Sequence, residues 1–175
     1  GRWLLVVADV AGKGIPAAIL MSGLRTRLRM LAETIEDPAE LVQRLNTGMA
    51  ADSTACEYAT VFLAVANPTA GTLAWVDAGH QPGLLVRGDG SFTRLDGTDL
   101  PVGMFPEASF TAQIDVISPG DRLVLFTDGV LDAAIDRNRD TTPEQLAAAI
   151  VAHPDATAGG AVEAARTLVN LITGG

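Results

Sequence analysis

Hydrophobic positions along the chain follow two periods, one typical of strands and one typical of helices. From Arg2 to Ala8 the residues are mostly apolar in an unbroken run, which predicts a buried strand. From Pro16 onward, apolar residues recur at helical spacing and mark one helix face: Ala17, Leu20, Met21, Leu24, Leu28 and Leu31. A second helix should begin at Asp37-Pro38-Ala39-Glu40, where a capping side chain precedes a proline suited to the first turn. Its apolar side would be Leu41, Leu45 and Met49.

The middle of the chain alternates strand-like segments with turn residues, which predicts hairpins and antiparallel pairing. The three expected pairs are Tyr58–Ala66 with Thr72–Ala78, Leu84–Arg87 with Ser91–Leu95, and Phe110–Val116 with Arg122–Thr127. Apolar residues occupy both faces of several of these strands, so the sheets should be covered on both sides.

Two further helices are expected near the end of the chain. Thr142-Pro143-Glu144-Gln145 forms a capping-box sequence, and residues 160–172 show helical spacing. The order is then a strand, two helices, a run of antiparallel strands and two helices. This order predicts an α+β domain over residues 1–175, built as an αββα sandwich of two mainly antiparallel sheets flanked by helices.

Composition narrows the class of protein. The chain has 175 residues, of which 48% are hydrophobic, so one packed domain is expected. A net charge of −9 argues against a nucleic-acid surface. Cys56 is the single cysteine, which excludes an internal disulfide. No apolar run has the length of a membrane span. We therefore expect a soluble, cytoplasmic domain, and a natural N-terminus upstream of the strand with which the sequence begins.

Two aspartates stand at the ends of apolar strands in similar surroundings. In LLVVADVAGKG, Asp9 follows an apolar run and glycines come after it; RLVLFTDGVLDA repeats this arrangement with Asp128. If both strand ends meet at one rim, the carboxylates repel each other unless a cation lies between them. Oxygen ligands favour Mg²⁺ or Mn²⁺. Ordinary turn aspartates also follow strands, so spacing alone leaves both interpretations open.

Other chemistry-bearing residues give weaker indications. A phosphate-binding loop at VAGKG is rejected, because Ala8 stands where the first glycine belongs and Gly14 follows the lysine. His80, in DAGHQPGLL, is either a ligand or acid–base group, or a hydrogen-bonded structural residue. Ser22 and Ser53 have no histidine or aspartate at a telling spacing, so nothing supports a nucleophilic serine.

Four segments together resemble a known family. DVAGKGIPAAILM, DAGHQPGLL, LPVGMF and GDRLVLFTDGVLDA resemble, in this order, the motifs of bacterial metal-dependent protein phosphatases of the type-2C (PPM) family, and most closely its SpoIIE/RsbU branch. The resemblance covers nearly the whole chain. It implies an αββα sandwich with two Mg²⁺ or Mn²⁺ ions at one edge and hydrolysis of phosphoserine or phosphothreonine by an activated water. It further implies an anti-anti-sigma factor (STAS-type) as substrate, in sigma-factor regulation, and a sensor domain upstream.

The resemblance also implies roles for individual residues. Asp9 matches the carboxylate that bridges both metal ions, and Val10 matches the position that donates a backbone carbonyl. Asp128 matches a ligand of the second of these two metal ions. Asp132 occupies a place where some relatives hold a weaker third ion, and His80 aligns loosely with an acidic residue of that third site, as a possible neighbour of the active site.

Departures from the family pattern leave two functions open. The upstream GGD-type motif and the terminal DD motif of the family are absent from the sequence, and Ala11 replaces the general-acid histidine of eukaryotic-type members. Lys13 and Gly14 are expected to shape the strand-to-helix turn. The first function is a phosphoprotein phosphatase whose missing carboxylates lie in a longer parent protein. The second is a catalytically weak or inactive regulatory domain of the same fold that binds a partner protein.

Overall fold

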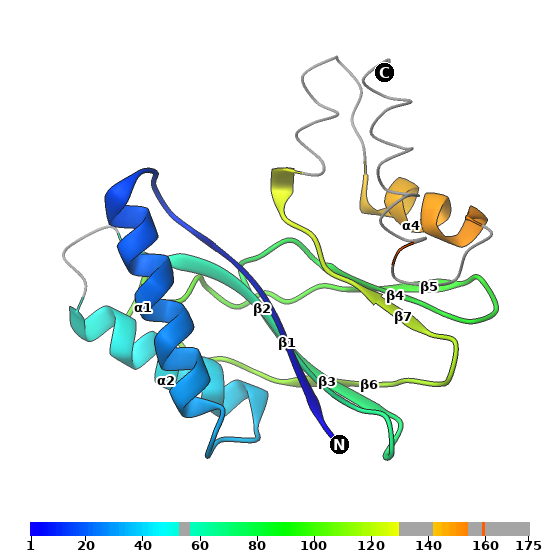
Figure 1. The fold of residues 1–175 in the computed structure, drawn as a ribbon, viewed down its shortest axis with the longest axis horizontal. Coiled ribbons are helices and arrows are strands. Elements are labelled where there is room, and N and C mark those ends of the chain that lie inside the picture. The colour runs from blue at the N-terminus through cyan, green and yellow to red at the C-terminus, as the bar shows by residue number, and fades with distance from the viewer. Residues whose placement is uncertain (53–56, 130–141, 154–158, 160–175) are drawn as a thin grey trace, which may run out of the picture. The chain divides into compact units, whose positions relative to one another are not determined.

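The computed structural model describes residues 1–52, 57–129, 142–153 and 159 (Figure 1). The chain divides into a first unit, Gly1–Gln81 with Asp96–Ile117, and a second unit, Pro82–Leu95 with Ser118–Gly175. Within the described residues, each unit contains one antiparallel sheet. The expected α+β class, with two antiparallel sheets and flanking helices, is confirmed.

The sheet of the first unit has the strand order β1-β2-β3-β6. Its strands are β1 (Trp3–Val10), β2 (Ala59–Asn67), β3 (Thr72–Ala78) and β6 (Gln113–Val116). The predicted β2–β3 hairpin is confirmed, and β3 has the predicted bounds. In its turn the Asn67 side chain accepts a hydrogen bond from the backbone N–H of Ala70 at 3.1 Å. The local turn chemistry therefore set this pairing.

Strand β1 differs from the prediction in burial. Among the described residues it lies at the edge of its sheet and pairs with β2 alone, and the Trp3 side chain is 67% exposed. The prediction of a buried strand is therefore wrong. An apolar run indicates a strand, but it does not tell how many neighbours that strand will have. The strand also extends to Val10, so Asp9 lies inside it.

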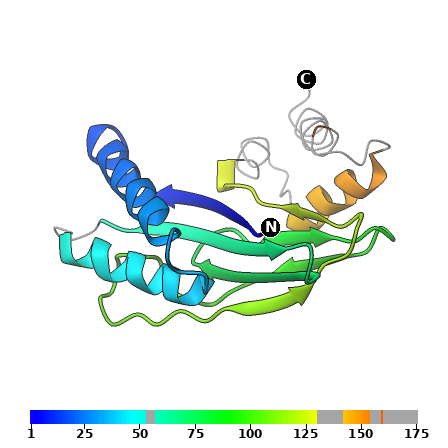
Figure 2. The same cartoon turned by 60° about the horizontal axis from the view of Figure 1, so that its bottom comes forward.

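Helices α1 (Ile15–Leu31) and α2 (Pro38–Asp52) pack against each other and against one face of this sheet (Figures 1 and 2). Leu24 of α1 is buried, and α2 buries the three residues of its predicted apolar side: Leu41, Leu45 and Met49. Asp37 caps α2 as expected, because its carboxylate accepts a hydrogen bond from the N–H of Ala39 at 2.9 Å.

The second unit contains a three-stranded sheet of order β5-β4-β7. Its strands are β4 (Gly83–Val86), β5 (Phe92–Leu95) and β7 (Arg122–Val124). Helix α4 (Pro143–Ala152) begins at Thr142 with the predicted capping box. The buried core of this second unit consists of Leu84, Val86, Phe126, Leu146, Ala147 and Ile150. The helix expected at residues 160–172 lies outside the described residues.

The third predicted hairpin, Phe110–Val116 with Arg122–Thr127, is wrong. Strand β6 pairs with β3 in one sheet, and β7 pairs with β4 in the other. The turn between them does form, since the N–H of Asp121 donates to the Ser118 carbonyl at 3.0 Å. However, the Asp121 carboxylate also accepts hydrogen bonds from Arg87 and from the N–H of Gly88. These contacts connect the turn to the loop between β4 and β5, so β7 continues beside β4.

No helix within the described ranges combines the length and the apolar character needed to cross a membrane.

Candidate active site

Asp9 is the penultimate residue of β1 and lies opposite Thr60 of β2. Its neighbours Ala8 and Val10 pack against the core under α1 and α2. Since side chains alternate along a strand, Asp9 projects from the opposite face of the sheet. Its side chain is exposed, and it makes no hydrogen bond or ion pair with any residue that the structure describes. The carboxylate is thus accessible to a ligand.

The backbone carbonyl of the next residue, Val10, points to the edge of the sheet. Ala11 donates its N–H to the Tyr58 carbonyl at 2.9 Å, and Val10 is paired with Ala59. Hydrogen-bonded and non-hydrogen-bonded pairs alternate in an antiparallel ladder, so the Val10 carbonyl points away from β2. Consistently, Ala59 exchanges hydrogen bonds with Val102 on its other side.

The turn after β1 depends on glycine. Gly12 and Gly14 have φ angles of 104° and 76°, a region that side-chain-bearing residues rarely adopt. Gly14 is the N-cap of α1, and its carbonyl accepts a hydrogen bond from Ala18 at 3.1 Å. This geometry agrees with the expectation that Gly14 shapes the turn, and it connects the end of β1 that carries Asp9 and Val10 directly to α1.

His80 lies close to Asp9 through one intervening residue. The Nδ1 atom of His80 is 2.9 Å from the hydroxyl oxygen of Thr60. The same hydroxyl is 3.5 Å from the backbone carbonyl oxygen of Asp9. The structure therefore brings His80 and Asp9 together at one end of the first sheet. Thr60 was missed by the sequence reasoning, because nothing in a strand sequence shows which residue the register places opposite Asp9.

A buried carboxylate supports the His80 turn. The Asp77 side chain accepts hydrogen bonds from the N–H of His80 at 2.8 Å and from the N–H of Gly97 at 3.2 Å. Burial raises the pKa of Asp77 to about 6, and the nearby carboxylates of Asp96 and Asp99 add to the rise. The hydrogen bonds from Gly97 and His80 oppose it. Asp77 was also missed, but the sequence offered a signal. An aspartate in DAGH can accept a hydrogen bond from the backbone of the turn that it opens.

Asp128 belongs to the second unit, where it begins a helical segment, and its side chain is exposed. It has no hydrogen-bond or ion-pair partner among the described residues. Asp132 lies outside those residues. Because Asp9 belongs to the first unit, the convergence of Asp9 and Asp128 at one metal site stays a prediction. The donors available are two carboxylates with no partner among the described residues and one backbone carbonyl, and Mg²⁺ and Mn²⁺ prefer oxygen donors of this kind. In the described ranges no three His, Cys, Asp or Glu side chains are grouped to hold a metal ion.

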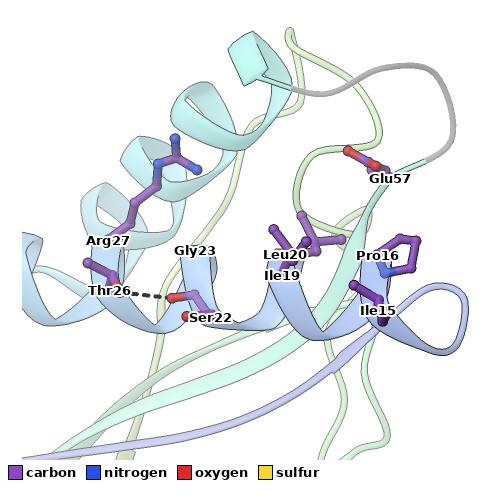
Figure 3. Close-up of a pocket in the computed structure, with 9 residues that line it drawn as sticks. All are labelled: Ile15, Pro16, Ile19, Leu20, Ser22, Gly23, Thr26, Arg27 and Glu57. Atoms are coloured by element: carbon purple, nitrogen blue, oxygen red, sulfur yellow. Dashed lines mark hydrogen bonds between the residues drawn. The ribbon is translucent and has the colours of Figure 1, made fainter.

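A cavity of about 760 Å³ lies along α1 from Ile15 to Arg27 (Figure 3). It is lined by residues of α1 from Ile15 to Arg27 and by Glu57. Figure 3 shows the hydrogen bond from the Thr26 hydroxyl to the Ser22 carbonyl on its wall. Among the described residues, the lining of this cavity includes none of the candidate site residues: Asp9, Val10, His80 and Asp128.

Comparison with solved structures defines the class of this domain. The PP2C phosphatase domain of SpoIIE from Bacillus subtilis matches with a TM-score of 0.84 and 15% identity, over 98% of this chain and 50% of that one. The catalytic domain of the serine/threonine protein phosphatase PstP, in complex with two manganese ions, matches with a TM-score of 0.69 and 18% identity, over 97% of this chain and 80% of that one. The fold is therefore that of PP2C phosphatases.

Sequence comparison then gives the family. The model of the Stage II sporulation protein E (SpoIIE) family matches residues 1–175, and the chain belongs to this family. Phosphoserine phosphatase RsbU of Bacillus subtilis (strain 168) is 32% identical over 129 residues, which are 73% of this chain. The chain spans 38% of the length of RsbU.

Proposed function

We propose that this domain is a metal-dependent serine/threonine phosphoprotein phosphatase. The observation that carries the proposal is the pair of oxygen donors at the end of β1. The Asp9 carboxylate is exposed and has no partner among the described residues, and the adjacent Val10 carbonyl points to the edge of the sheet. Membership of the SpoIIE family supports the same function.

Four residues would hold the cations. In this proposal the Asp9 carboxylate would serve both Mn²⁺ or Mg²⁺ ions, Val10 would contribute its backbone carbonyl, and Asp128 would hold one of the ions. Asp132 contributes to a weaker site. When bound, the ions supply positive charge that orients a phosphate, lowers the pKa of a water nucleophile and stabilises the charge that develops during phosphoryl transfer.

The chain's own residues provide negative charge and position. With a net charge of −9, the domain needs bound cations to attract a phosphorylated substrate. The sequence supports no nucleophilic serine, so no phosphoenzyme is expected. Activity should therefore require Mn²⁺ or Mg²⁺ and should survive reagents that modify serine or cysteine. Full activity in excess chelator would contradict the proposal.

The substrate we propose is a phosphorylated anti-anti-sigma factor of the STAS type. The support is the resemblance to the SpoIIE/RsbU branch and the similarity to a protein named phosphoserine phosphatase RsbU. A cytoplasmic location and an upstream sensor domain in the parent protein belong to the same proposal. The second candidate function is a weakly catalytic regulatory domain that binds a partner protein.

Substitution of the proposed ligands separates these functions. We expect Asp9→Asn to lower metal-dependent phosphate release from a phosphorylated STAS-type protein by roughly 10²-fold or more, since a bridging ligand serves both ions. Asp128→Asn should be nearly as damaging and Asp132→Asn milder. His80→Ala should be milder again, or neutral if His80 is a structural residue. The matched control is Glu33→Gln, which removes an exposed carboxylate that has no partner among the described residues.

The stability of these variants gives a second readout. Loss of the Asp9 charge removes carboxylate repulsion in the metal-free protein, so Asp9→Asn should leave the melting temperature unchanged or slightly raised. A structural aspartate would behave in the opposite way. Wild-type turnover by Asp9→Asn would show that the bridging assignment is wrong.

A further inference from the structure

Thr60 connects two parts of the candidate site that are distant in the sequence. The β1–β2 register places it opposite Asp9. The β2–β3 register pairs Val61 with Ala78, so Thr60 also lies next to the turn that follows β3 and carries His80. Its hydroxyl oxygen is 2.9 Å from His80 Nδ1 and 3.5 Å from the Asp9 carbonyl oxygen.

The two contacts of the Thr60 hydroxyl are linked because it has one proton. The carbonyl oxygen of Asp9 can only accept a hydrogen bond. If the hydroxyl donates to this carbonyl, His80 Nδ1 must carry a proton and donate to Thr60. If the hydroxyl donates to Nδ1, the contact with the carbonyl is lost. The Thr60 hydroxyl therefore couples the tautomer of His80 to the backbone of Asp9.

The backbone of the His80 turn is held independently. Asp77 accepts the N–H of His80 and also that of Gly97. Gly79 lies so close to Pro101 that a Cβ added at position 79 would be 2.9 Å from the proline Cγ. With the turn backbone fixed in this way, the orientation of the imidazole ring depends on its own contacts, of which the Thr60 hydroxyl supplies one.

On the basis of the proposed function, we propose that Thr60 is a positioning residue of the active site: its hydroxyl orients the His80 ring against the metal-ligand end of β1. Thr60 touches neither metal ion nor phosphate in this proposal. It keeps the Asp9 backbone and the His80 ring in one arrangement, as outer partners of metal ligands commonly do.

Two substitutions at position 60 give opposite expectations for positioning and for packing. Thr60→Val keeps the branched shape and removes the hydroxyl, whereas Thr60→Ser keeps the hydroxyl and removes the methyl group. A positioning role predicts a loss of about 10-fold in Mn²⁺ affinity or in kcat/KM for Thr60→Val, with rescue by Thr60→Ser. Pure packing predicts the reverse order, and that result would overturn the proposal.

A measurement without metal tests the hydrogen bond itself. The ¹⁵N chemical shifts of the His80 ring should change in metal-free Thr60→Val and stay close to the wild-type values in Thr60→Ser. Thr60→Val and His80→Ala should also be non-additive in Mn²⁺ affinity, since each removes the same contact. Unchanged ring shifts together with additive effects would refute the coupling.

The outcome for Thr60 can be distinguished from the outcome for the proposed function. If the wild-type chain binds Mn²⁺ but releases no phosphate, the phosphatase proposal fails. The ring shifts and the Mn²⁺ affinities of the position-60 variants then still decide whether Thr60 orients His80.

Discussion

The buried carboxylate of Asp77 should make the stability of the protein depend on pH. The side chain is 4% exposed, and burial raises its pKa from 3.8 to about 6. Between these two values the folded state binds more protons at Asp77 than the unfolded state does. The contribution of Asp77 to the free energy of unfolding is therefore highest at low pH, and it falls as the pH rises toward about 6.

The magnitude follows from the size of the shift. One pKa unit corresponds to about 1.36 kcal/mol. A shift from 3.8 to about 6 thus lowers the free energy of unfolding by about 3 kcal/mol between acidic and neutral pH. Asp77→Asn removes this titration. It also replaces one of the two acceptor oxygens with an NH₂ group, which adds a cost that does not change with pH.

Urea unfolding across a pH series measures this effect. The difference in unfolding free energy between wild type and Asp77→Asn should change by about 2 kcal/mol from about pH 4 to about pH 7, with wild type losing stability relative to the variant; the remainder of the total of about 3 kcal/mol appears only below about pH 4. Groups that titrate equally in both proteins cancel in the difference. A difference that stays constant with pH would refute the reasoning.

Asp121 provides a control of opposite sign. Burial acts to raise the pKa of its carboxyl, but hydrogen bonds from the N–H groups of Ser118 and Gly88 and from Arg87 hold that pKa below its ordinary value. A depressed pKa contributes stability that is lost as the pH falls through the folded-state value. On acidification, wild type should therefore lose stability relative to Asp121→Asn. Over the same change in pH, wild type should gain stability relative to Asp77→Asn.

The remaining predictions concern two local features of the fold. Gly97→Ala would place a Cβ 2.6 Å from Asp77 Cβ, so it should lower the free energy of unfolding by about 1–3 kcal/mol. Urea unfolding measures this loss. An unchanged urea midpoint would show that the backbone at Gly97 is not in close contact with Asp77. Thr142→Ala removes the capping box of α4 and should lower the free energy of unfolding by about 1 kcal/mol in the same assay. Thr142→Ser keeps the capping hydroxyl and should retain most of the stability. Equal losses of stability in both variants would contradict the capping role.

Local sequence signals were sufficient for much of the secondary structure. Helix α1 followed from the helical spacing of its apolar residues after Pro16, and the starts of α2 and α4 followed from aspartate and threonine at their caps. The β2–β3 hairpin followed from its turn residues. These features depend on residues within a few positions of one another, so a single sequence contains the information. The partners of β6 and β7 did not follow from their turn, because contacts of Asp121 with a distant loop decided them.

The candidate site divides in the same way. The sequence by itself indicated that Asp9 would lie near the end of an apolar strand and that glycines would shape the turn after it, since these depend on neighbouring residues. The expectation that Asp128 stands at a strand end was wrong, because Asp128 begins a helical segment beyond the end of β7. Only the tertiary structure decided that β1 is an edge strand among the described residues, that Thr60 lies between Asp9 and His80, and that Asp77 is buried. Strand order and register set these three properties, because they bring together residues that are up to dozens of positions apart along the chain.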